Sequence, residues 1–274
     1  MVYIKKNSCC HCSHEMENYK VTDLLGRGGN GTVFKATHVK GNEVAIKLVD
    51  EKSIERWHWT TKQGRVPIEV SLLRHLTDAP GVIRLVDYFK QGKLHCIVME
   101  RPRAMDLYDF ISTQEGERVP EDTARVLFKR VLDIVHGVHQ RGIVHLDIKQ
   151  ENFLIDPSTL QLWLIDFGSG RFRENRRFSS VPGTKEFFPP EYICHKRYYA
   201  EKAEVWALGV FLCNLITGVD AFPTPKHTCA GKFYLNENTV SKELVQLLSQ
   251  ALDVAPTRRA TLEQLRVSPW VLNS

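Results

Sequence analysis

The sequence has no long apolar run, no internal repeat and no low-complexity segment. Its most apolar stretch, residues 205–216, is too short to cross a bilayer and contains Asn214. Residues 1–19 also lack the apolar core of a secretory signal. We therefore expect no membrane association and a cytoplasmic location, with the nucleus as a second compartment that the sequence leaves open.

Cysteine is scarce as well. The chain has seven cysteines, an odd number, and Cys96 and Cys213 stand singly in apolar segments. This pattern favours free thiols in a reducing compartment over a disulfide framework. One group of candidate zinc ligands is packed into consecutive positions near the start: Cys9, Cys10, His11, Cys12 and His14. Zinc sites typically draw their ligands from two separated pairs, so we expect a polar, flexible leader over residues 1–18 rather than a metal site.

Neither sign of charge is strongly in excess, since the formal net charge is +5 and is not concentrated in one tail. This balance suits an anionic ligand and does not require nucleic acid as a partner. With 43% hydrophobic and 25% charged residues, the composition is that of a globular protein. At 274 residues the chain is near the size at which one core divides into two, so we expect a single unit made of two lobes.

Strand patterns dominate the first hundred residues, and helical patterns dominate the rest. β-rich runs occupy 21–25, 32–36, 43–49, 82–89 and 94–99. One helical pattern interrupts them at 66–76, where Val70, Leu73 and Leu76 recur at helical spacing. After Pro102, helical patterns cover 121–142, 203–217, 241–252 and 261–267. This order predicts an α+β chain with two lobes, 19–101 and 102–274.

Gly26, Gly28 and Gly31 form a Gly-x-Gly-x-x-Gly turn between two predicted strands. Glycines allow the backbone to approach phosphate groups closely. Dinucleotide-binding turns share this spacing, but a helix follows them. Here the β-branched run 32–36 follows, which favours a phosphate-binding loop between two strands.

Lys47 ends the run Val-Ala-Ile-Lys at residues 44–47. A lysine among apolar strand residues is costly to bury alone, so it either points to water at an edge or pairs with a carboxylate. Glu69, on the predicted helix, is the obvious partner. The paired lysine would contact nucleotide phosphates.

The densest cluster of reactive side chains is His-Leu-Asp-Ile-Lys-Gln-Glu-Asn at 145–152, followed by Ile-Asp-Phe-Gly at 165–168. In-line phosphoryl transfer needs a carboxylate near the attacking hydroxyl, metal ligands and neutralising cations. Asp147 can accept the hydroxyl proton or orient the hydroxyl, and Lys149 can neutralise the γ-phosphate. Asn152 and Asp166 offer the oxygen ligands that Mg²⁺ prefers.

These motifs, in this order, resemble those of the eukaryotic protein kinase superfamily from Tyr19 to the end of the chain. The resemblance implies a bilobal fold, with an antiparallel sheet and one main helix in the N-lobe, a mostly helical C-lobe and ATP in the cleft. It also implies a structural ion pair between Glu191 and Arg259. The residues that it assigns to the nucleotide are Leu25, Gly26, Gly28, Gly31, Val33, Ala45, Lys47, Glu69, Met99, Glu100 and Asp166.

Two details of the resemblance imply specificity for serine and threonine. Lys149 lies two residues after Asp147, where tyrosine kinases usually carry a different pattern. Thr184 would contact both of these residues. The expected enzyme is a non-specific protein serine/threonine kinase that uses ATP and Mg²⁺ on protein substrates.

Within the superfamily the chain looks most like the PIM kinases. The likeness is carried by the hinge at 99–102 and by the segments 65–70, 81–85, 166–170 and 205–209. Because Pro102 has no N–H, the resemblance implies a single hinge hydrogen bond to adenine, accepted by the Glu100 carbonyl. It also implies a preference for basic peptides, which Asp106, Asp109 and Glu151 would attract.

Three features depart from the kinase patterns. Leu146 replaces an arginine that in many kinases binds a phosphorylated activation loop, and we therefore predict activity without loop phosphorylation. Four arginines stand where PIM kinases are acidic, and they either repel basic substrates or form a solvated loop without influence: Arg171, Arg173, Arg176 and Arg177. Glu204 replaces a common aspartate, and little is inferred from it because PIM kinases also depart there.

Two other functions remain open from the sequence alone. The altered His-Leu-Asp motif lends some support to a pseudokinase, but all of the expected catalytic residues are present: Lys47, Glu69, Asp147, Asn152 and Asp166. A small-molecule phosphotransferase is disfavoured by Glu191, Arg259 and Thr184, which are typical of peptide-binding kinases. We expect a monomer that binds protein substrates and no nucleic acid.

Overall fold

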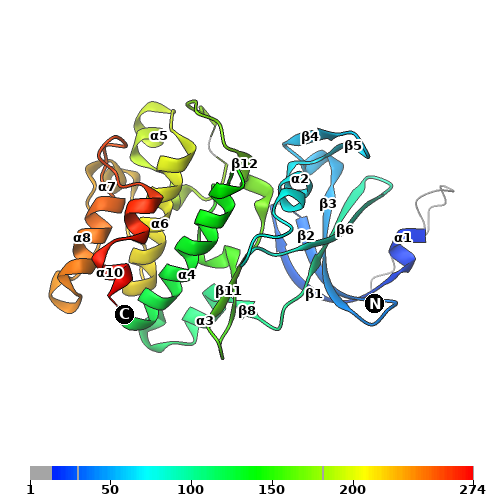
Figure 1. Cartoon of the computed structure of the whole chain (residues 1–274), viewed down its shortest axis with the longest axis horizontal. Helices are drawn as coiled ribbons and strands as arrows, with labels where there is room; N and C mark the ends of the chain where they lie inside the picture. Colours follow the sequence, from blue (N-terminus) through cyan, green and yellow to red (C-terminus); the bar gives the residue numbers. More distant parts are fainter. Residues whose placement is uncertain (1–13, 30, 181, 274) are drawn as a thin grey trace. The chain divides into compact units, whose positions relative to one another are not determined.

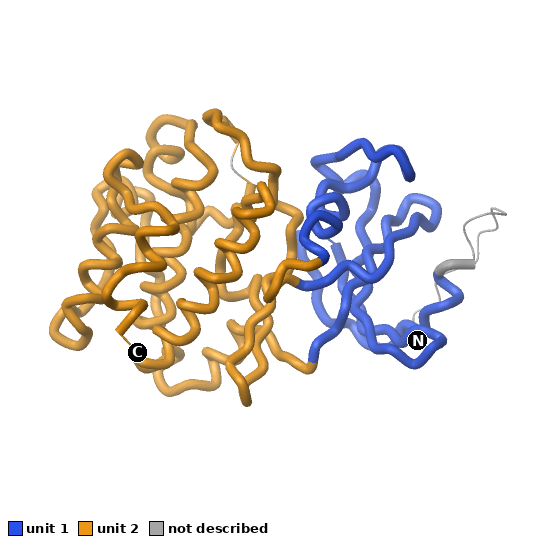
Figure 2. The backbone as a smooth tube through the Cα atoms, in the orientation of Figure 1, with its two compact units in different colours: residues 1–77, 83–102 blue, residues 78–82, 103–274 orange. Residues whose placement is uncertain are grey.

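The computed structural model describes residues 14–29, 31–180 and 182–273. It divides into two compact units, drawn in different colours in Figure 2: unit 1 comprises residues 1–77 and 83–102, and unit 2 comprises residues 78–82 and 103–274. The candidate zinc ligands at 9–12 lie outside the described residues, and the first described element is the short helix α1 (His14–Glu17).

Unit 1 is built around a five-stranded antiparallel sheet with the strand order β1-β2-β3-β7-β6 (Figure 1). Its strands are β1 (Tyr19–Gly28), β2 (Gly31–His38), β3 (Glu43–Asp50), β6 (Leu85–Gln91) and β7 (Leu94–Glu100). Alternation decides the two faces, because successive side chains of a strand point to opposite sides. One face carries the buried cluster of Ala36, Val44, Ile46 and Val98, closed by Met16 of α1.

A hairpin of two short strands precedes the main helix of unit 1. The strands β4 (Trp57–Thr60) and β5 (Gly64–Pro67) pair with each other, and α2 (Ile68–His75) follows directly. The sequence pattern predicted that this helix begins at residue 66, which is two residues too early. Val66 pairs with His58 in the hairpin, and Pro67 has an extended ψ of 141° at the N-cap, so the helix begins at Ile68.

Unit 2 is mostly helical, and α6 is its buried centre. The helices are α3 (Leu107–Ser112), α4 (Glu121–Gln140), α5 (Pro190–His195), α6 (Ala200–Thr217), α7 (Pro225–Ala230), α8 (Lys242–Ala251), α9 (Leu262–Arg266) and α10 (Pro269–Leu272). Nearly every residue of α6 is buried, because α4 and α8 pack against it (Figure 1). At Gly209 a methyl group would lie 2.7 Å from Leu252, so α6 needs its glycine where the end of α8 approaches. The sheet and these helices confirm the predicted α+β class.

Short strands and single 3₁₀ turns connect the helices of unit 2. The strands are β8 (Met105–Asp106), β9 (Ile143–Val144), β10 (Phe153–Asp156), β11 (Gln161–Leu164) and β12 (Arg171–Phe172). The 3₁₀ turns are η2 (Glu115–Glu117), η3 (Gln150–Asn152), η4 (Phe167–Ser169), η5 (Lys185–Phe187) and η6 (Glu237–Thr239), while η1 (Glu51–Ser53) belongs to unit 1. Residues 78–82 join unit 2 because the Gly81 carbonyl accepts a hydrogen bond from the Leu164 N–H, at 2.8 Å.

The predicted ion pair between Glu191 and Arg259 is confirmed. The two guanidinium nitrogens Nη1 and Nη2 donate to the two carboxylate oxygens at 2.9 and 2.8 Å. The arginine side chain is fully buried, and it also donates to the carbonyls of Asp253 and Lys202. Because a bidentate pair fixes orientation as well as distance, this contact holds α5 against the segment that precedes α9.

Among residues 14–273, leaving out 30 and 181, no helix is long and apolar enough to span a bilayer.

Candidate active site

The glycine-rich turn connects β1 to β2, so a strand follows it, as predicted. The register pairs Gly26 with Val33 and Gly28 with Gly31. A Cβ on Gly26 or Gly28 would meet no atom within 4 Å, which leaves the backbone open for a ligand. Gly31 is required by the fold itself, because its φ is +130° and a Cβ would lie 2.6 Å from the Leu48 carbonyl oxygen.

Lys47 and Glu69 form a buried ion pair, as predicted from the sequence. The ammonium nitrogen lies 2.9 Å from each carboxylate oxygen, and both side chains are about 5% exposed. The lysine comes from the centre of the sheet and the glutamate from the first turn of α2. A buried charge is tolerated only with a close partner, so the pair fixes the distance between β3 and α2.

The nucleotide residues proposed in unit 1 share one face of its sheet. Val33 pairs with Lys47 across β2 and β3, and Ala45 pairs with Met99 across β3 and β7. Ala45 and Lys47 are two residues apart on one strand, so all four side chains point the same way. This face therefore offers a small apolar surface beside one cation, while Leu25 is half exposed at the end of β1.

The hinge between β7 and unit 2 is held by local bonds. The Glu100 N–H donates to the Arg84 carbonyl at 3.0 Å, and the Glu100 carboxylate accepts the N–H of Arg84 at 3.0 Å. Pro102 has no N–H to donate. The sequence analysis assigned the adenine hydrogen bond to the Glu100 carbonyl, and this carbonyl lies at the hinge as expected.

In unit 2 the candidate catalytic loop, residues 145–152, is folded around Asp147. The Thr184 N–H and hydroxyl both donate to Asp147 Oδ1, at 3.0 and 2.9 Å. Lys149 Nζ donates to the Thr184 hydroxyl at 2.8 Å and lies 3.8 Å from Asp147 Oδ2. The predicted contact of Thr184 with both residues is therefore present.

Gly183 permits the close approach that this network requires. Its φ is +96°, and a Cβ there would lie 2.6 Å from the Leu146 carbonyl oxygen and 3.0 Å from Asp147 Oδ1. No other residue type could bring the Thr184 N–H to the same carboxylate without displacing the loop.

Asn152 and Asp166 are brought side by side through their backbones. The Ile165 N–H donates to the Asn152 carbonyl at 2.9 Å, so Asp166 follows immediately. Asn152 uses its amide nitrogen to donate to the Asp147 carbonyl and carboxylate, at 2.6 and 3.0 Å. Its amide oxygen is then the atom oriented away from these acceptors. Asp166 has the left-handed φ of 57°, with Oδ1 accepting from the Gly168 N–H.

This donor set fits a hard cation. Amide and carboxylate oxygens are the ligands that divalent magnesium or calcium takes, and no thiolate or imidazole is among them. Within the described part of the chain there is no group of three or more His, Cys, Asp or Glu side chains suited to a metal. A cation at Asn152 and Asp166 would therefore need oxygen atoms from a ligand as well.

Glu204 is the site residue that the sequence reasoning undervalued. It lies in the first turns of α6, is 1% exposed, and accepts the backbone N–H groups of His145 and Leu146 at 2.7 and 2.9 Å. Its second oxygen bonds Nε2 of His139 on α4. The signal was the position of Glu204 directly before the apolar run 205–213, because an acid buried with such a run needs partners.

The pKa of Glu204 reflects these partners. Burial by itself raises the pKa of a carboxyl, but the contact with His139 and the backbone N–H groups outweigh it and hold the pKa below its usual value of 4.5. The carboxylate is thus charged in the folded state, and it anchors the loop that carries Asp147.

The four arginines that were predicted either to repel basic substrates or to form a solvated loop without influence all make contacts within unit 2. Arg171 and Arg176 both stack over the Phe178 ring, and Arg177 stacks over Tyr199. Arg173 donates to the His139 carbonyl at 2.9 Å and pairs with Glu201. Arg173, Arg176 and Arg177 are also exposed, so the loop is both solvated and held by contacts of its flat guanidinium groups with aromatic faces.

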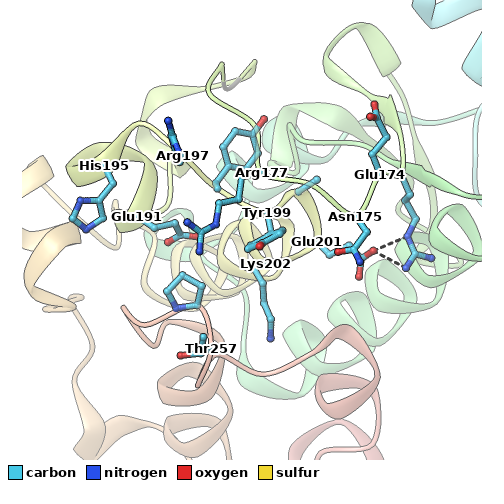
Figure 3. Close-up of a pocket in the computed structure, with 14 residues that line it drawn as sticks. Glu174, Asn175, Arg177, Glu191, His195, Arg197, Tyr199, Glu201, Lys202 and Thr257 are labelled. Atoms are coloured by element: carbon cyan, nitrogen blue, oxygen red, sulfur yellow. Dashed lines mark hydrogen bonds and ion pairs between the residues drawn. The ribbon is translucent and has the colours of Figure 1, made fainter.

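Two of these arginines, Arg173 and Arg177, line a pocket of about 840 Å³ (Figure 3). Residues of the arginine-rich segment, α5 and the start of α6 line it, and Arg177, Arg197 and Lys202 are labelled in the view. Asp147 and Thr184 are not among its lining residues. The pocket is therefore separate from the catalytic loop.

Asp106, Asp109 and Glu151 form an acidic group in unit 2. Asp106 caps α3 by accepting the Tyr108 N–H at 2.8 Å. Partial burial, reinforced by the charges of Asp109 and Glu151, raises the pKa of Asp106 to about 6. The three carboxylates are thus close enough to repel each other, and a cation placed among them would relieve that repulsion.

Comparison with known proteins gives consistent similarities. The family model of the protein kinase domain matches residues 19–271. The chain is 35% identical, over 93% of its length, to the serine/threonine-protein kinase prk-2 of Caenorhabditis elegans, and it covers 58% of that protein. It is 34% identical, over 95% of its length, to the serine/threonine-protein kinase pim-2 of Danio rerio, and it covers 87% of that protein. The chain thus spans less than two thirds of the first relative and most of the second.

Removing the Glu204 carboxylate should destabilise unit 2. Glu204→Ala leaves two buried N–H groups and His139 without an acceptor, and we expect a loss of about 3–5 kcal/mol in the free energy of unfolding. Glu204→Gln keeps an acceptor oxygen and should lower the free energy of unfolding by less. Urea denaturation monitored by tryptophan fluorescence measures both variants.

The pH dependence of the free energy of unfolding tests whether Glu204 is charged. A depressed carboxyl pKa adds stability that is present above about pH 4.5 and is lost as the pH falls through the folded-state value. The difference between wild type and Glu204→Gln should therefore shrink in acid. A difference that stays constant down to acid unfolding would contradict the assigned charge.

Proposed function

Because the chain belongs to the protein kinase family, we propose that it transfers the γ-phosphoryl group of ATP to serine and threonine hydroxyls of protein substrates. The observation that carries the proposal is the bonded set of Asp147, Lys149 and Thr184. The hydroxyl of Thr184 lies at hydrogen-bonding distance from both the Asp147 carboxylate and the Lys149 ammonium group. Such preorganisation is the main contribution that a protein makes to phosphoryl transfer.

Asp147 is the proposed acceptor of the substrate proton. Thr184 fixes one carboxylate oxygen, so the other can meet a hydroxyl in a constant orientation. Lys149, 3.8 Å from that second oxygen, would neutralise charge on the transferred phosphoryl group. A substrate serine or threonine is favoured because this arrangement contains Thr184, as the family resemblance implies.

Unit 1 would bind the nucleotide with the glycine turn and Lys47 at the phosphates. The apolar face of Val33, Ala45 and Met99 would contact the adenine, and the Glu100 carbonyl would accept a hydrogen bond from the adenine amino group. In unit 2, Asn152 and Asp166 would hold Mg²⁺. This ion, when bound, supplies positive charge to the phosphate oxygens.

Activity without phosphorylation of the activation segment, defined here as residues 166–191, is the second part of the proposal. Leu146 packs with the buried cluster of Phe178 and Tyr198, and these two residues exchange backbone hydrogen bonds at 2.8 and 3.0 Å. The Tyr198 hydroxyl donates to the Ser180 carbonyl. Apolar packing and neutral hydrogen bonds therefore anchor the segment where other kinases use a phosphate and an arginine.

A basic peptide is the proposed substrate class. Asp106, Asp109 and Glu151 concentrate negative charge in unit 2. The opposing arginines of the activation segment are engaged with aromatic rings and Glu201, which reduces their reach toward a peptide. We also propose that the protein acts in the cytoplasm, as a monomer, with no nucleic acid or membrane partner.

Asp147→Asn should retain the fold and fail to turn over. The amide can still accept from Thr184, but it cannot take a proton, so transfer should fall by about 10² to 10⁴-fold. The assay is Mg²⁺-dependent transfer of labelled γ-phosphate to serine peptides. Asp156→Asn is the matched control, because that exposed carboxylate closes a turn with Ser158 and Thr159 outside the candidate site. Absence of transfer from folded, ATP-binding wild type would instead indicate a pseudokinase.

Treatment with a protein phosphatase should leave turnover unchanged within about twofold, because no arginine at position 146 requires a phosphate partner. Mass spectrometry of the treated protein must show unmodified Ser179 and Ser180. Loss of activity upon removal of phosphate would contradict the proposal, and Leu146→Arg would then be the variant to compare.

Binding of basic peptides should weaken in acid. Asp106 is charged above its pKa of about 6, so protonation below that value removes one of three attracting charges. We expect KM for an arginine-rich peptide to rise about two- to fivefold between about pH 7.5 and about pH 5.5. Asp106→Asn should raise KM at the higher pH and abolish this part of the pH dependence. An equal dependence for an acidic peptide would overturn the assignment.

A further inference from the structure

Two cysteines from separate helices meet on the surface of unit 2. Cys194 lies near the end of α5, and Cys229 lies in α7, which packs against α5. Their sulfur atoms are 2.9 Å apart, although the residues are 35 positions apart in sequence. Both are free thiols. No functional residue described above uses either of them.

The distance and the exposure distinguish this pair from the other described cysteines. Two sulfurs at 2.9 Å are about 0.9 Å farther apart than in a disulfide bond of about 2.05 Å. Cys194 is exposed and Cys229 is partly exposed, whereas Cys96 and Cys213 are buried. A soluble oxidant can therefore reach one thiol whose partner is already in contact.

We propose that Cys194 and Cys229 form a redox modification site, at which a peroxide oxidises the pair to a disulfide that ties α5 to α7. The proposal does not rest on the phosphoryl-transfer activity, because it concerns the thiols alone. It also fits the free state of the other two described cysteines, Cys96 and Cys213, since disulfides in reducing compartments usually form transiently.

The chemistry balances with hydrogen peroxide as the oxidant. The Cys194 sulfur attacks a peroxide oxygen, the O–O bond breaks, and a sulfenic acid and one water form. The Cys229 sulfur then attacks the sulfenic sulfur, the S–O bond breaks, and the Cys229 proton leaves with the hydroxyl as a second water. Two thiols lose two electrons in total, and one peroxide is reduced to two waters.

The local environment favours this order of events. The hydrogen bond to Cys194, together with burial, raises the pKa of Cys229 to about 11. Cys229 therefore keeps its proton until a sulfenic acid forms beside it, while the exposed Cys194 meets the oxidant first. Cys229 is then in place as the resolving thiol.

The disulfide would act on the activation segment through α5. Glu191 of α5 is bound to Arg259, and Tyr192 packs against the cluster that contains Phe178 and Tyr198. Covalent attachment to α7 would add a third restraint to this short helix. Thr184 precedes η5, and α5 follows η5 in the chain. The disulfide would therefore limit the movement of the part of the activation segment that contains Thr184.

The test is oxidation of the full chain with hydrogen peroxide, blocking of remaining thiols and tryptic mapping. Cys194 and Cys229 fall in separate peptides, 186–196 and 227–232, each with a single cysteine, and the cysteines of 9–12 fall in another. We expect the first two peptides to appear linked, lighter than their sum by two hydrogens, and to separate upon reduction. The melting temperature should rise by about 5 °C, because the bond closes a long loop of the unfolded chain.

Cys194→Ser and Cys229→Ser are matched controls, since each leaves one thiol that can be oxidised but cannot be bridged. Both variants should show no link and no rise in melting temperature with peroxide. The proposal is overturned if wild type, while folded, accumulates sulfinic acid or blocked thiol at both cysteines without the linked peptides. It is also overturned if a single-serine variant shows the same rise in melting temperature.

Discussion

The carboxylate of Glu204 is the interaction on which the candidate catalytic loop depends. It is the buried acid at the start of an apolar helix, and its two oxygens reach two different elements, the His145–Leu146 backbone and His139 on α4. Leu146 follows with a φ of 63°, a conformation that a leucine adopts only when its surroundings compensate for the strain. Here the compensation is the bond from the Leu146 N–H to the carboxylate. The position of Asp147, one residue later, is therefore set by a charge in the helical core.

Unit 1 uses the same principle in its own half of the candidate site. Lys47 and Glu69 are both nearly inaccessible to solvent, and neither could be buried alone without a large desolvation penalty. The pair consequently contributes more to fixing the position of α2 against β3 than to the stability of the two elements. Buried charges with close partners thus position the candidate residues in each unit, while the apolar packing around them supplies the stability.

Sequence patterns predicted the features that depend on local periodicity or on a complete motif. The strands of the sheet, the long helices and the pairs of Lys47 with Glu69 and Glu191 with Arg259 are all found in the structure. The β4–β5 hairpin was missed because Trp57 and Trp59 alternate with polar residues over only four positions. The role of Glu204 and the contact of Arg177 with Tyr199 were missed for another reason: their partners are distant in sequence, and no spacing rule connects them. The same holds for Cys194 and Cys229.

The replacement of an arginine by Leu146 has a physical consequence for control of the activation segment. A charged side chain there would need an anionic partner, whereas leucine joins Phe178 and Tyr198 in an apolar cluster that is complete without modification. The arginines of the segment reinforce that cluster from outside, because two of them cover the Phe178 ring. If the protein is active without phosphorylation of this segment, as we propose, the apolar cluster takes the place of the electrostatic switch that phosphorylation would operate. Any control of its position must then act on packing or on covalent attachment, and α5, which carries Cys194 at the surface, is where such an attachment would reach it.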